Sequence, residues 1–252
     1  MADRLDGTVA LVTGASSGIG VTTALELARH GAAVALAARR VERLDELAAR
    51  IRADGGVAAV LPADVTREEQ AHELIERTVA ELGRLDTLIN NAGMMLLGPV
   101  EGAPTDEWRQ MIEVNLLGLM YCAQAALPHL VSAAAGAPRQ VADLVNISSV
   151  AGRIARNGSA VYNATKHGVG AFSEALRQEV TTRHVRVSVI EPGVTETELA
   201  GHNRPEVLES IRSQFGQRLD ASDIADAISY VVTRPRHVAV NEVLIRPTEQ
   251  QR

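Results

Sequence analysis

The fold is decided by the stretch Thr8-Val9-Ala10-Leu11-Val12-Thr13-Gly14-Ala15-Ser16-Ser17-Gly18-Ile19-Gly20. Its first six residues form a short run with an apolar centre, which is typical of a parallel strand buried on both faces. Three glycines follow at the spacing G-x-x-x-G-x-G, and a helical pattern then continues to His30, where Gly31 ends it. The stretch therefore predicts a strand, a tight turn and a helix, which is the beginning of a βαβ unit.

The same alternation of strand and helix patterns continues along the chain. We expect further strands over 33–38, 57–62, 86–90, 141–147, 185–190 and 241–246, and helices over 41–54, 67–82, 105–131 and 159–182. Strands joined in this way need right-handed crossovers and form a parallel sheet. The sequence predicts one α/β domain over 1–252, a doubly wound parallel sheet of about seven strands with helices on both faces. The Ala-Gly-Pro stretch at 133–138 is expected to be a surface loop and not a domain boundary.

Composition excludes several classes of protein. Of 252 residues, 46% are hydrophobic and 22% are charged, which argues against a disordered chain. The single cysteine, Cys122, cannot form an internal disulfide. A net charge of −6 without a basic run argues against nucleic acid or an anionic membrane as a partner. We expect no apolar stretch to reach the roughly 18 residues of a membrane helix, and no signal peptide is evident, so we expect a soluble cytoplasmic protein.

The glycine-rich turn predicts a phosphate site. Glycines let the backbone approach a phosphate closely, and the helix that follows offers unpaired N–H groups and the positive end of its dipole. Ordinary tight-turn chemistry is the alternative, but the position in the first βα unit favours a dinucleotide. The residues that would form the site are Gly14, Ser16, Ser17, Gly18, Ile19 and Gly20.

The end of the second strand predicts which dinucleotide binds. An NAD site normally has an acidic residue here for the ribose hydroxyls, whereas an arginine accommodates a 2′-phosphate. This chain has Arg39 and Arg40 and no acidic residue at that point. The alternative is a solvated helix start, although positive charge is unfavourable at that end of the dipole. We therefore expect NADP(H).

A tyrosine and a lysine four residues apart predict proton chemistry. Tyr162 and Lys166 share one face of a helical stretch, and an ammonium beside a phenol favours the phenolate and lowers its pKa. Arginine stays protonated and cannot exchange a proton in this way. Of the 25 basic residues 24 are arginine, so the only lysine of the chain stands here. A chance pair on a solvated helix is the alternative.

Six motifs together resemble the short-chain dehydrogenase/reductase family over essentially the whole chain. They are Thr13–Gly20, 90–93 (Asn-Asn-Ala-Gly), 115–118 (Asn-Leu-Leu-Gly), 146–149 (Asn-Ile-Ser-Ser), 162–166 (Tyr-Asn-Ala-Thr-Lys) and 192–193 (Pro-Gly). The resemblance implies a single-domain Rossmann-type fold. It also implies hydride transfer between a nicotinamide and a carbonyl or alcohol carbon, for which no metal is required.

The resemblance also assigns catalytic roles. Tyr162 would protonate the substrate oxygen in reduction or act as the base in oxidation, and Ser149 would hydrogen-bond the substrate carbonyl, Ser148 being the second candidate. Lys166 would lower the pKa of Tyr162, and both residues would hold the nicotinamide ribose. Asn115 resembles the residue that anchors a water in the proton relay. The alternative is a polar helix residue that has no role in catalysis.

Further cofactor contacts follow from the same resemblance, with ordinary loop formation as the alternative in each case. Two residues after the third strand would touch adenine, three after the fourth would lie beside the adenosine ribose, and four after the sixth would cradle the carboxamide and pyrophosphate. These sets are Asp64 and Val65; Asn91, Ala92 and Gly93; and Pro192, Gly193, Thr195 and Thr197.

The substrate is less constrained by the sequence. A segment over about 194–219 is expected to cover it, and His202, Arg204 or Arg212 in that segment could pair with a carboxylate. Several stretches, among them 95–100 and 245–248, resemble the clavaldehyde reductase-like members of the family, which reduce the β-lactam aldehyde clavulanate-9-aldehyde with NADPH in antibiotic biosynthesis. Scattered histidines, and Asp220, Asp223 and Asp226 near a helix start, do not predict a metal site.

The sequence thus predicts an NADP(H)-dependent oxidoreductase of a small aldehyde or ketone, acting on the alcohol in reverse. The alternatives are an NAD-dependent dehydrogenase of a sugar or other secondary alcohol, and a dinucleotide-sensing protein without catalysis. The family resemblance also implies a homo-oligomer, a tetramer or a dimer.

Overall fold

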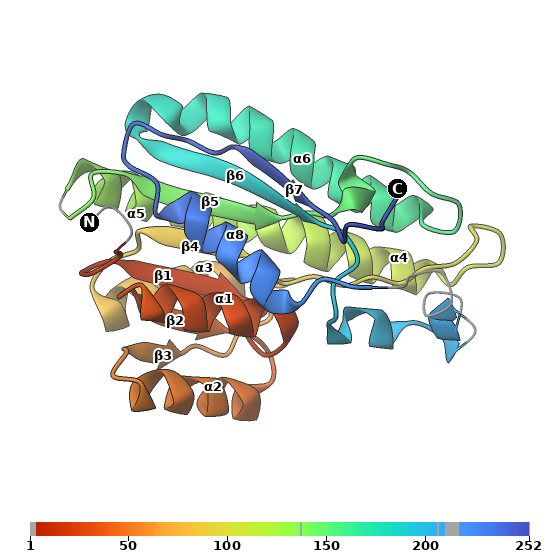
Figure 1. Cartoon of the computed structure of the whole chain (residues 1–252), viewed down its shortest axis with the longest axis horizontal. Coiled ribbons are helices and arrows are strands. Elements are labelled where there is room, and N and C mark those ends of the chain that lie inside the picture. Colours follow the sequence, from red (N-terminus) through yellow and green to blue (C-terminus); the bar gives the residue numbers. More distant parts are fainter. Residues whose placement is uncertain (1–3, 137, 206, 210–216, 252) are drawn as a thin grey trace.

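A computed structural model describes residues 4–136, 138–205, 207–209 and 217–251 and shows a seven-stranded, entirely parallel sheet (Figure 1). The strand order is β3-β2-β1-β4-β5-β6-β7. The strands are β1 Val9–Thr13, β2 Ala33–Ala37, β3 Ala58–Val60, β4 Thr87–Asn90, β5 Ala142–Ile147, β6 Val185–Pro192 and β7 Glu242–Ile245. The predicted fold class is therefore confirmed.

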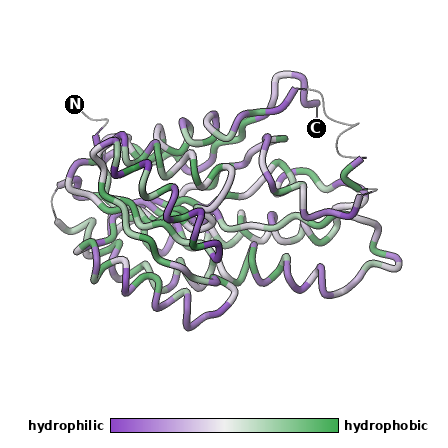
Figure 2. The backbone as a smooth tube through the Cα atoms, turned by 90° about the horizontal axis from the view of Figure 1, so that it is seen from below, coloured by the Kyte–Doolittle hydropathy of each residue, from purple (hydrophilic) through white to green (hydrophobic). Residues whose placement is uncertain are grey.

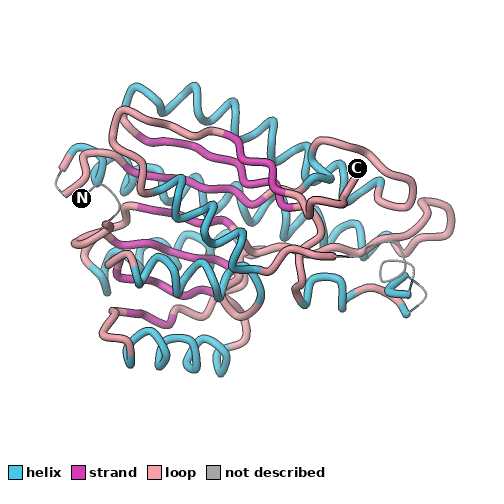
Figure 3. Tube along the Cα trace, viewed as in Figure 1, coloured by secondary structure: helices cyan, strands magenta, loops and turns pink. Residues whose placement is uncertain are grey.

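Helices cover both faces of this sheet (Figures 1 and 3). On one face lie α1 Gly18–Arg29, α2 Val41–Ala53 and α8 Ala221–Val232, and on the other α3 Glu68–Leu82, α5 Gly118–Ala135 and α6 Ala160–Val180. The remaining helical elements are α4 Thr105–Ile112, the π-helix η1 Glu113–Leu117 and the short 3₁₀ turns η2 Val150–Gly152, η3 Thr181–Arg183 and η4 Glu198–His202. Asp220 and Asp223 form a capping box at the start of α8, in agreement with the helix start predicted near them.

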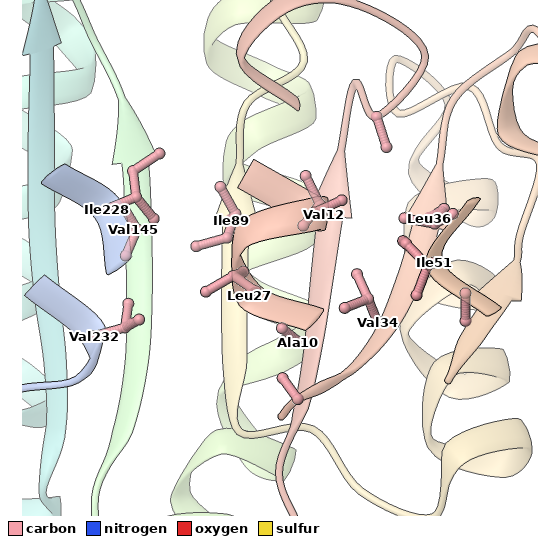
Figure 4. Packing of buried hydrophobic residues seen from close by; sticks show 14 of the residues in the cluster. Ala10, Val12, Leu27, Val34, Leu36, Ile51, Ile89, Val145, Ile228 and Val232 are labelled. Carbon is pink, nitrogen blue, oxygen red and sulfur yellow. The ribbon is translucent and has the colours of Figure 1, made fainter. Parts of the chain in front are cut away.

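Two apolar layers hold the helices to the sheet. Figure 4 shows Val12, Leu36 and Ile89 of the strands beside Leu27 of α1 and Ile51 of α2, all of them fully or almost fully buried. Along the tube in Figure 2, apolar and polar residues alternate on the helices. The buried residues recur at helical spacing, as Leu44, Leu47, Ala48 and Ile51 do in α2, so one face of each helix packs on the sheet. The central strands are buried on both faces and mostly apolar, and buried polar residues such as Asp143 and Asn146 of β5 are hydrogen-bonded.

One predicted helix differs in the structure. The helix expected over 105–131 is divided into α4, the π-helix η1 and α5, and α5 continues to Ala135. In η1 one turn is wider than in an α-helix, and Asn115 at its centre is buried and bonded to the loop after β4. The spacing of apolar residues cannot reveal a wider turn only five residues long, whereas π-turns commonly mark functional sites.

The same helical stretch corrects a second expectation. By length and composition alone Thr105–Ala135 is long and apolar enough to cross a membrane, with a mean hydropathy of 1.3 over its most apolar window. However, Cys122, Ala126 and Leu130 of α5 are buried in the layer between this helix and the sheet. The core helix of a folded domain meets the same criteria, so the stretch is weak evidence for a membrane span.

The topology fixes where a ligand can bind. The chain leaves β3 at one edge and returns beside β1 as β4, so the connections after β1 and β4 run to opposite faces of the sheet. Open sheets of this kind bind ligands at the carboxyl ends of the strands beside that point.

Candidate active site

A cavity of about 430 Å³ opens at the carboxyl ends of the strands. It brings together nearly all of the residues that the sequence predicts for the site, from segments that follow β1 to β6. Lining the cavity are Gly14, Ser16, Ser17, Gly18, Ile19, Arg39, Arg40, Asp64, Val65, Asn91, Ala92, Gly93, Ser149, Tyr162, Lys166, Pro192, Gly193, Thr195 and Thr197. Gly20 and Asn115 are not among the lining residues and position residues that are.

The turn after β1 is a conformation that only glycine adopts readily. Gly14 has φ +67° and Gly18 has φ +52°, both in the left-handed region. At Gly20 an added Cβ would lie 2.3 Å from the carbonyl oxygen of Gly14, closer than any real contact. The three glycines therefore permit one tight turn that exposes the backbone at the start of α1.

Polar side chains clamp this turn to the loop after β4. The Thr13 hydroxyl accepts hydrogen bonds from the backbone N–H groups of Asn91 and Ala92, at 3.0 and 3.1 Å. The Asn91 amide in turn donates to the carbonyl oxygens of Thr13 and Gly14, at 3.0 and 3.3 Å. The loop that carries Asn91, Ala92 and Gly93 is thus held in one position against the glycine-rich turn.

Three arginines gather at the far end of the cavity. Arg40 donates to the Ser16 hydroxyl through Nε and Nη2, at 3.1 and 2.9 Å, and to Glu198 through Nη1 at 2.9 Å. Arg43, which the sequence analysis did not single out, donates to the other oxygen of Glu198 at 2.6 Å. Arg39 is exposed and has no hydrogen bond or ion pair with any residue that the structure describes.

Tyr162, Lys166 and Ser149 lie together at the other end. α6 presents Tyr162 and Lys166 on its buried face, and the Lys166 Nζ atom lies 5.9 Å from the centre of the Tyr162 ring. Lys166 Nζ donates to the carbonyl oxygen of Ile147 at 2.8 Å, which holds the ammonium against the end of β5. Ser149 is the second residue after β5, and it hydrogen-bonds the Tyr162 side chain.

The protonation of this pair differs from the expectation that Lys166 lowers the pKa of Tyr162. Burial raises the pKa of Tyr162 to about 12, and the hydrogen bond with Ser149 offsets this only in part. Burial also lowers the pKa of Lys166 to about 8. The side chains are 6% and 5% exposed, so desolvation of the charged forms dominates both pKa values. The phenol is therefore protonated at neutral pH, as a proton donor must be.

The structure distinguishes between the two serines after β5. The Ser148 hydroxyl is buried and donates to the carbonyl oxygen of Lys166 at 3.0 Å. Ser149 contacts the Tyr162 side chain, and its hydroxyl accepts a hydrogen bond from the Ala151 N–H at 3.1 Å. Ser148 therefore supports α6, and Ser149 is the hydroxyl beside the phenol.

Asn115 uses its side chain to position the loop beside the site. Its Oδ1 accepts from the Met94 N–H at 2.7 Å, and its Nδ2 donates to the Met94 carbonyl at 2.8 Å. Nδ2 also lies 3.2 Å from the hydroxyl of Thr165, whose own hydrogen bond goes to the carbonyl oxygen of Tyr162. Asn115 thus joins the π-turn, the loop after Gly93 and the helix of Tyr162.

Sequence reasoning missed two positioning asparagines. The Asn163 amide donates to the carbonyl oxygens of Ala151 and Ile154 and accepts from the Arg156 N–H, so it fixes the loop between Ser149 and α6. Asn203 bonds the backbone of Met95 and Leu97 and ties the segment after β6 to the loop after β4. Asn163 follows Tyr162 directly, which was the one available signal.

The segment expected to cover the substrate is partly described. Leu199, Ala200 and His202 line the cavity, whereas Arg204 lies 3.9 Å from Glu107 and is not a lining residue. Arg212, Ile211 and Phe215 lie outside the described residues. Arg156 and Arg218 line the cavity and were not predicted.

The residues present suit a nicotinamide dinucleotide. The glycine-rich turn and Ser16, Arg39 and Arg40 provide N–H groups and positive charge for phosphates at one end, and Tyr162 and Lys166 lie at the other. Across the described ranges no group of three or more histidine, cysteine or carboxylate side chains could hold a metal ion.

Comparisons with known proteins agree with this architecture. The model of the short chain dehydrogenase family matches residues 8–208. An uncharacterized oxidoreductase of Staphylococcus saprophyticus is 37% identical over 245 residues, 96% of each chain. The closed form of a serine dehydrogenase complexed with NADP+ is 32% identical with a TM-score of 0.88 and 97% of each chain covered.

A second solved structure, a short chain dehydrogenase/reductase of Burkholderia phymatum in complex with NAD, is 25% identical with a TM-score of 0.84. It covers 96% of this chain and 89% of its own. Of these two similar structures, one was solved with NADP+ and the other with NAD. The resemblance to clavaldehyde reductase-like proteins stays a prediction. The match over most of the length, together with the relative's 37% identity, makes the chain a member of the short-chain dehydrogenase/reductase family.

Proposed function

We propose that this protein is an NADP(H)-dependent reductase of small aldehydes or ketones. The observation that carries the proposal is that Ser149, Tyr162 and Lys166 share one cavity with the glycine-rich turn and with Arg39 and Arg40. A dinucleotide bound along the turn would bring its nicotinamide to the Tyr162 end.

The side chains would divide the chemistry among themselves. When bound, the cofactor supplies a hydride to the carbonyl carbon in reduction, or accepts one from the alcohol in the reverse direction. Tyr162 donates its phenolic proton to the oxygen on which negative charge develops, and the Ser149 hydroxyl donates a hydrogen bond to that oxygen. Lys166 holds positive charge near the phenolate that remains until a proton returns. Asn115 keeps this arrangement in place through Met94 and Thr165.

The preference for NADP(H) is supported by charge at the adenosine end. Arg39 is exposed and forms no hydrogen bond or ion pair with any described residue. Arg40, the next residue, donates two hydrogen bonds to the Ser16 hydroxyl. A 2′-phosphate carries close to two negative charges and three acceptor oxygens, which such a group of donors suits. The residues that follow β2 include Arg39 and Arg40 and no acidic residue. An NAD site normally has an acidic residue there to accept hydrogen bonds from the two free ribose hydroxyls.

A carboxylate on the substrate is supported by the residues around the catalytic end. Arg156 and His202 line the cavity, and Asp64 is the only acidic residue among the described residues that line it. Asn163 fixes the backbone of Arg156 next to Tyr162. Serine, the compound in the name of the similar serine dehydrogenase, carries a carboxylate, and so does clavulanate-9-aldehyde, which the narrower sequence resemblance suggests.

One alternative has its own support. A relative solved with NAD shares the fold over nearly its full length, so an NAD-dependent dehydrogenase of a sugar or another secondary alcohol is the second candidate. A dinucleotide-sensing protein without catalysis has no such support, because Tyr162 and Lys166 are both present and adjacent.

Absorbance at 340 nm tests the proposal directly. NADPH and NADH are offered in parallel with matched aldehydes and ketones that do or do not carry a carboxylate, clavulanate-9-aldehyde among them, and the reverse reaction is run with 3-hydroxy acids and simple sugars. We expect turnover with NADPH and a higher kcat/KM for the carboxylated member of each pair. Turnover confined to NADH would favour the second candidate, and turnover with neither cofactor would contradict a reductase.

A further inference from the structure

Glu198 places a carboxylate on the arginines at the adenosine end of the cavity. Its two oxygens lie 2.9 Å from Arg40 Nη1 and 2.6 Å from Arg43 Nη1. Arg40 is held on its other side by the Ser16 hydroxyl, and Arg43 Nη1 lies 3.5 Å from the Ser16 carbonyl oxygen. Glu198 belongs to η4, in the segment after β6, so two distant parts of the chain meet over these guanidinium groups.

A carboxylate and a phosphate need the same donors. Both anions bind guanidinium N–H groups, and Arg40 already uses its remaining donors on the Ser16 hydroxyl, which lies 2.9 Å from Nη2. Two anions on one guanidinium repel each other, and the repulsion grows with the charge of the phosphate, which is close to −2 at neutral pH. A ribose without the 2′-phosphate brings no such charge to this position.

The Glu198 contact is suited to being broken. The side chains of Glu198, Arg40 and Arg43 are 50%, 43% and 44% exposed, and ion pairs at this exposure are weak because water and salt screen them. The neighbouring segment has separate anchors: Thr197 packs against Gly18, and Asn203 is bonded to Met95 and Leu97. The Glu198 side chain can therefore leave the arginines while the segment stays in place.

We propose that Glu198 competes with the 2′-phosphate of NADP(H) for Arg40 and Arg43 and so limits the preference of this protein for NADP(H) over NAD(H). The inference rests on the proposed use of NADP(H). It makes Glu198 a specificity-determining residue that never touches the reacting atoms. We expect NADP(H) to bind less tightly than it would if Arg39, Arg40 and Arg43 were present without Glu198.

The test is a binding titration by isothermal calorimetry with NADP+ and NAD+. Glu198→Gln removes the charge and keeps the shape. Glu196→Gln is the matched control, because Glu196 lies two residues away, is exposed, and pairs with Arg218 at 2.7 Å and not with the three arginines. We expect Glu198→Gln to bind NADP+ about fivefold more tightly, which corresponds to about 1 kcal/mol, and NAD+ within twofold of the wild type. Glu196→Gln should match the wild type with both ligands.

A double variant tests whether Glu198 acts on NADP+ binding through Arg40. In Arg40→Gln, which removes one guanidinium, the further change Glu198→Gln should give a smaller gain than it gives in the wild type, since the two residues would then be coupled. Glu198→Gln with unchanged or weaker NADP+ binding, in a protein that prefers NADP+, would overturn the role of Glu198 and leave the proposed function intact. A wild type that binds NADP+ no more tightly than NAD+ would overturn the proposed cofactor itself.

Discussion

At the scale of single residues, Arg39 is the cleanest probe of the cofactor. It is exposed and bonded to no described residue, so its replacement should leave the fold unchanged. We expect Arg39→Asp to shift the ratio of kcat/KM for NADPH and NADH toward NADH by at least about tenfold, or about 1.4 kcal/mol. An aspartate both removes a phosphate partner and supplies an acceptor for two ribose hydroxyls. An unchanged ratio would contradict the assignment of Arg39 to the 2′-phosphate.

Burial of the Lys166 ammonium should lower the free energy of unfolding of the protein. Its pKa falls from 10.5 to about 8 on folding, so the unfolded chain binds more protons between those values and the wild type gains stability as the pH rises through that window. The desolvation corresponds to about 3 kcal/mol at pH 7, while the lost bond to Ile147 is worth about 1 kcal/mol. We expect Lys166→Met to be more stable by about 1 to 2 kcal/mol at pH 7.

Urea unfolding at two pH values checks this sign. At pH 10 the lysine is neutral in the folded protein and mostly charged in the unfolded chain, so the advantage of Lys166→Met should disappear. Effects of other titrating groups cancel in the difference between the two proteins. A variant that is less stable than the wild type at pH 7, with a difference that does not change at pH 10, would mean that burial of the ammonium is not unfavourable.

At the scale of elements, the glycine-rich turn leads to opposite predictions for two helix glycines. In Gly20→Ala the new Cβ would lie 2.3 Å from the Gly14 carbonyl oxygen, so the turn must open. We expect a loss of about 1 to 3 kcal/mol and dinucleotide binding weakened at least about tenfold. Gly170 of α6 has no atom within 4 Å of the same position, and Gly170→Ala should stabilise by about 0.5 to 1 kcal/mol. Thermal unfolding and a dinucleotide titration of both variants test the pair.

The elements also show which features the sequence could predict. Strong periodicity and glycine stops located the strands and most helices to within one or two residues, as for α2, predicted over 41–54 and observed as Val41–Ala53. The end of β6 was predicted two residues too early, at 190 and not at Pro192, because its last pair with Ile245 of β7 depends on a contact far apart in the chain. The π-turn at Asn115 was missed, because a widened turn only five residues long does not change the spacing of apolar residues, and the bond between Asn115 and Met94 that accompanies it is a tertiary contact.

The same distinction applies to the site. Motifs placed the glycine-rich turn, Ser149, Tyr162 and Lys166 because their chemistry requires particular residue types at fixed spacing. Arg43 and Glu198 join the site only through tertiary contacts, and nothing in their neighbourhood in the sequence marks them. For Asn163 the only signal in the sequence is its position directly after Tyr162. The net upward shift of the Tyr162 pKa was not predicted, because the depth of burial that causes it is a property of the whole fold.

At the scale of the whole molecule, the family resemblance leads us to expect a homo-oligomer. Ile112 and Leu117 flank Asn115 in the chain and are 41% and 37% exposed, so they are available for a contact between two copies of the chain. We expect sedimentation to give a mass at least twice the 26.8 kDa of one chain, and Ile112→Asp with Leu117→Asp to lower it. Val57→Asp, at another exposed valine, is the control. A wild type that sediments as one chain would contradict the expectation.

The most direct test of the whole account is the rate of NADPH oxidation by Tyr162→Phe with a carbonyl compound that the wild type reduces. Tyr230→Phe is the matched control, since Tyr230 is 54% exposed and stacks on Arg234 away from the cavity. We predict that Tyr162→Phe binds NADPH within a few-fold of the wild type and loses at least about a hundredfold in kcat, as removal of a general acid should, while Tyr230→Phe keeps its activity. A Tyr162→Phe protein with wild-type kcat would contradict the central claim that this phenol delivers the proton.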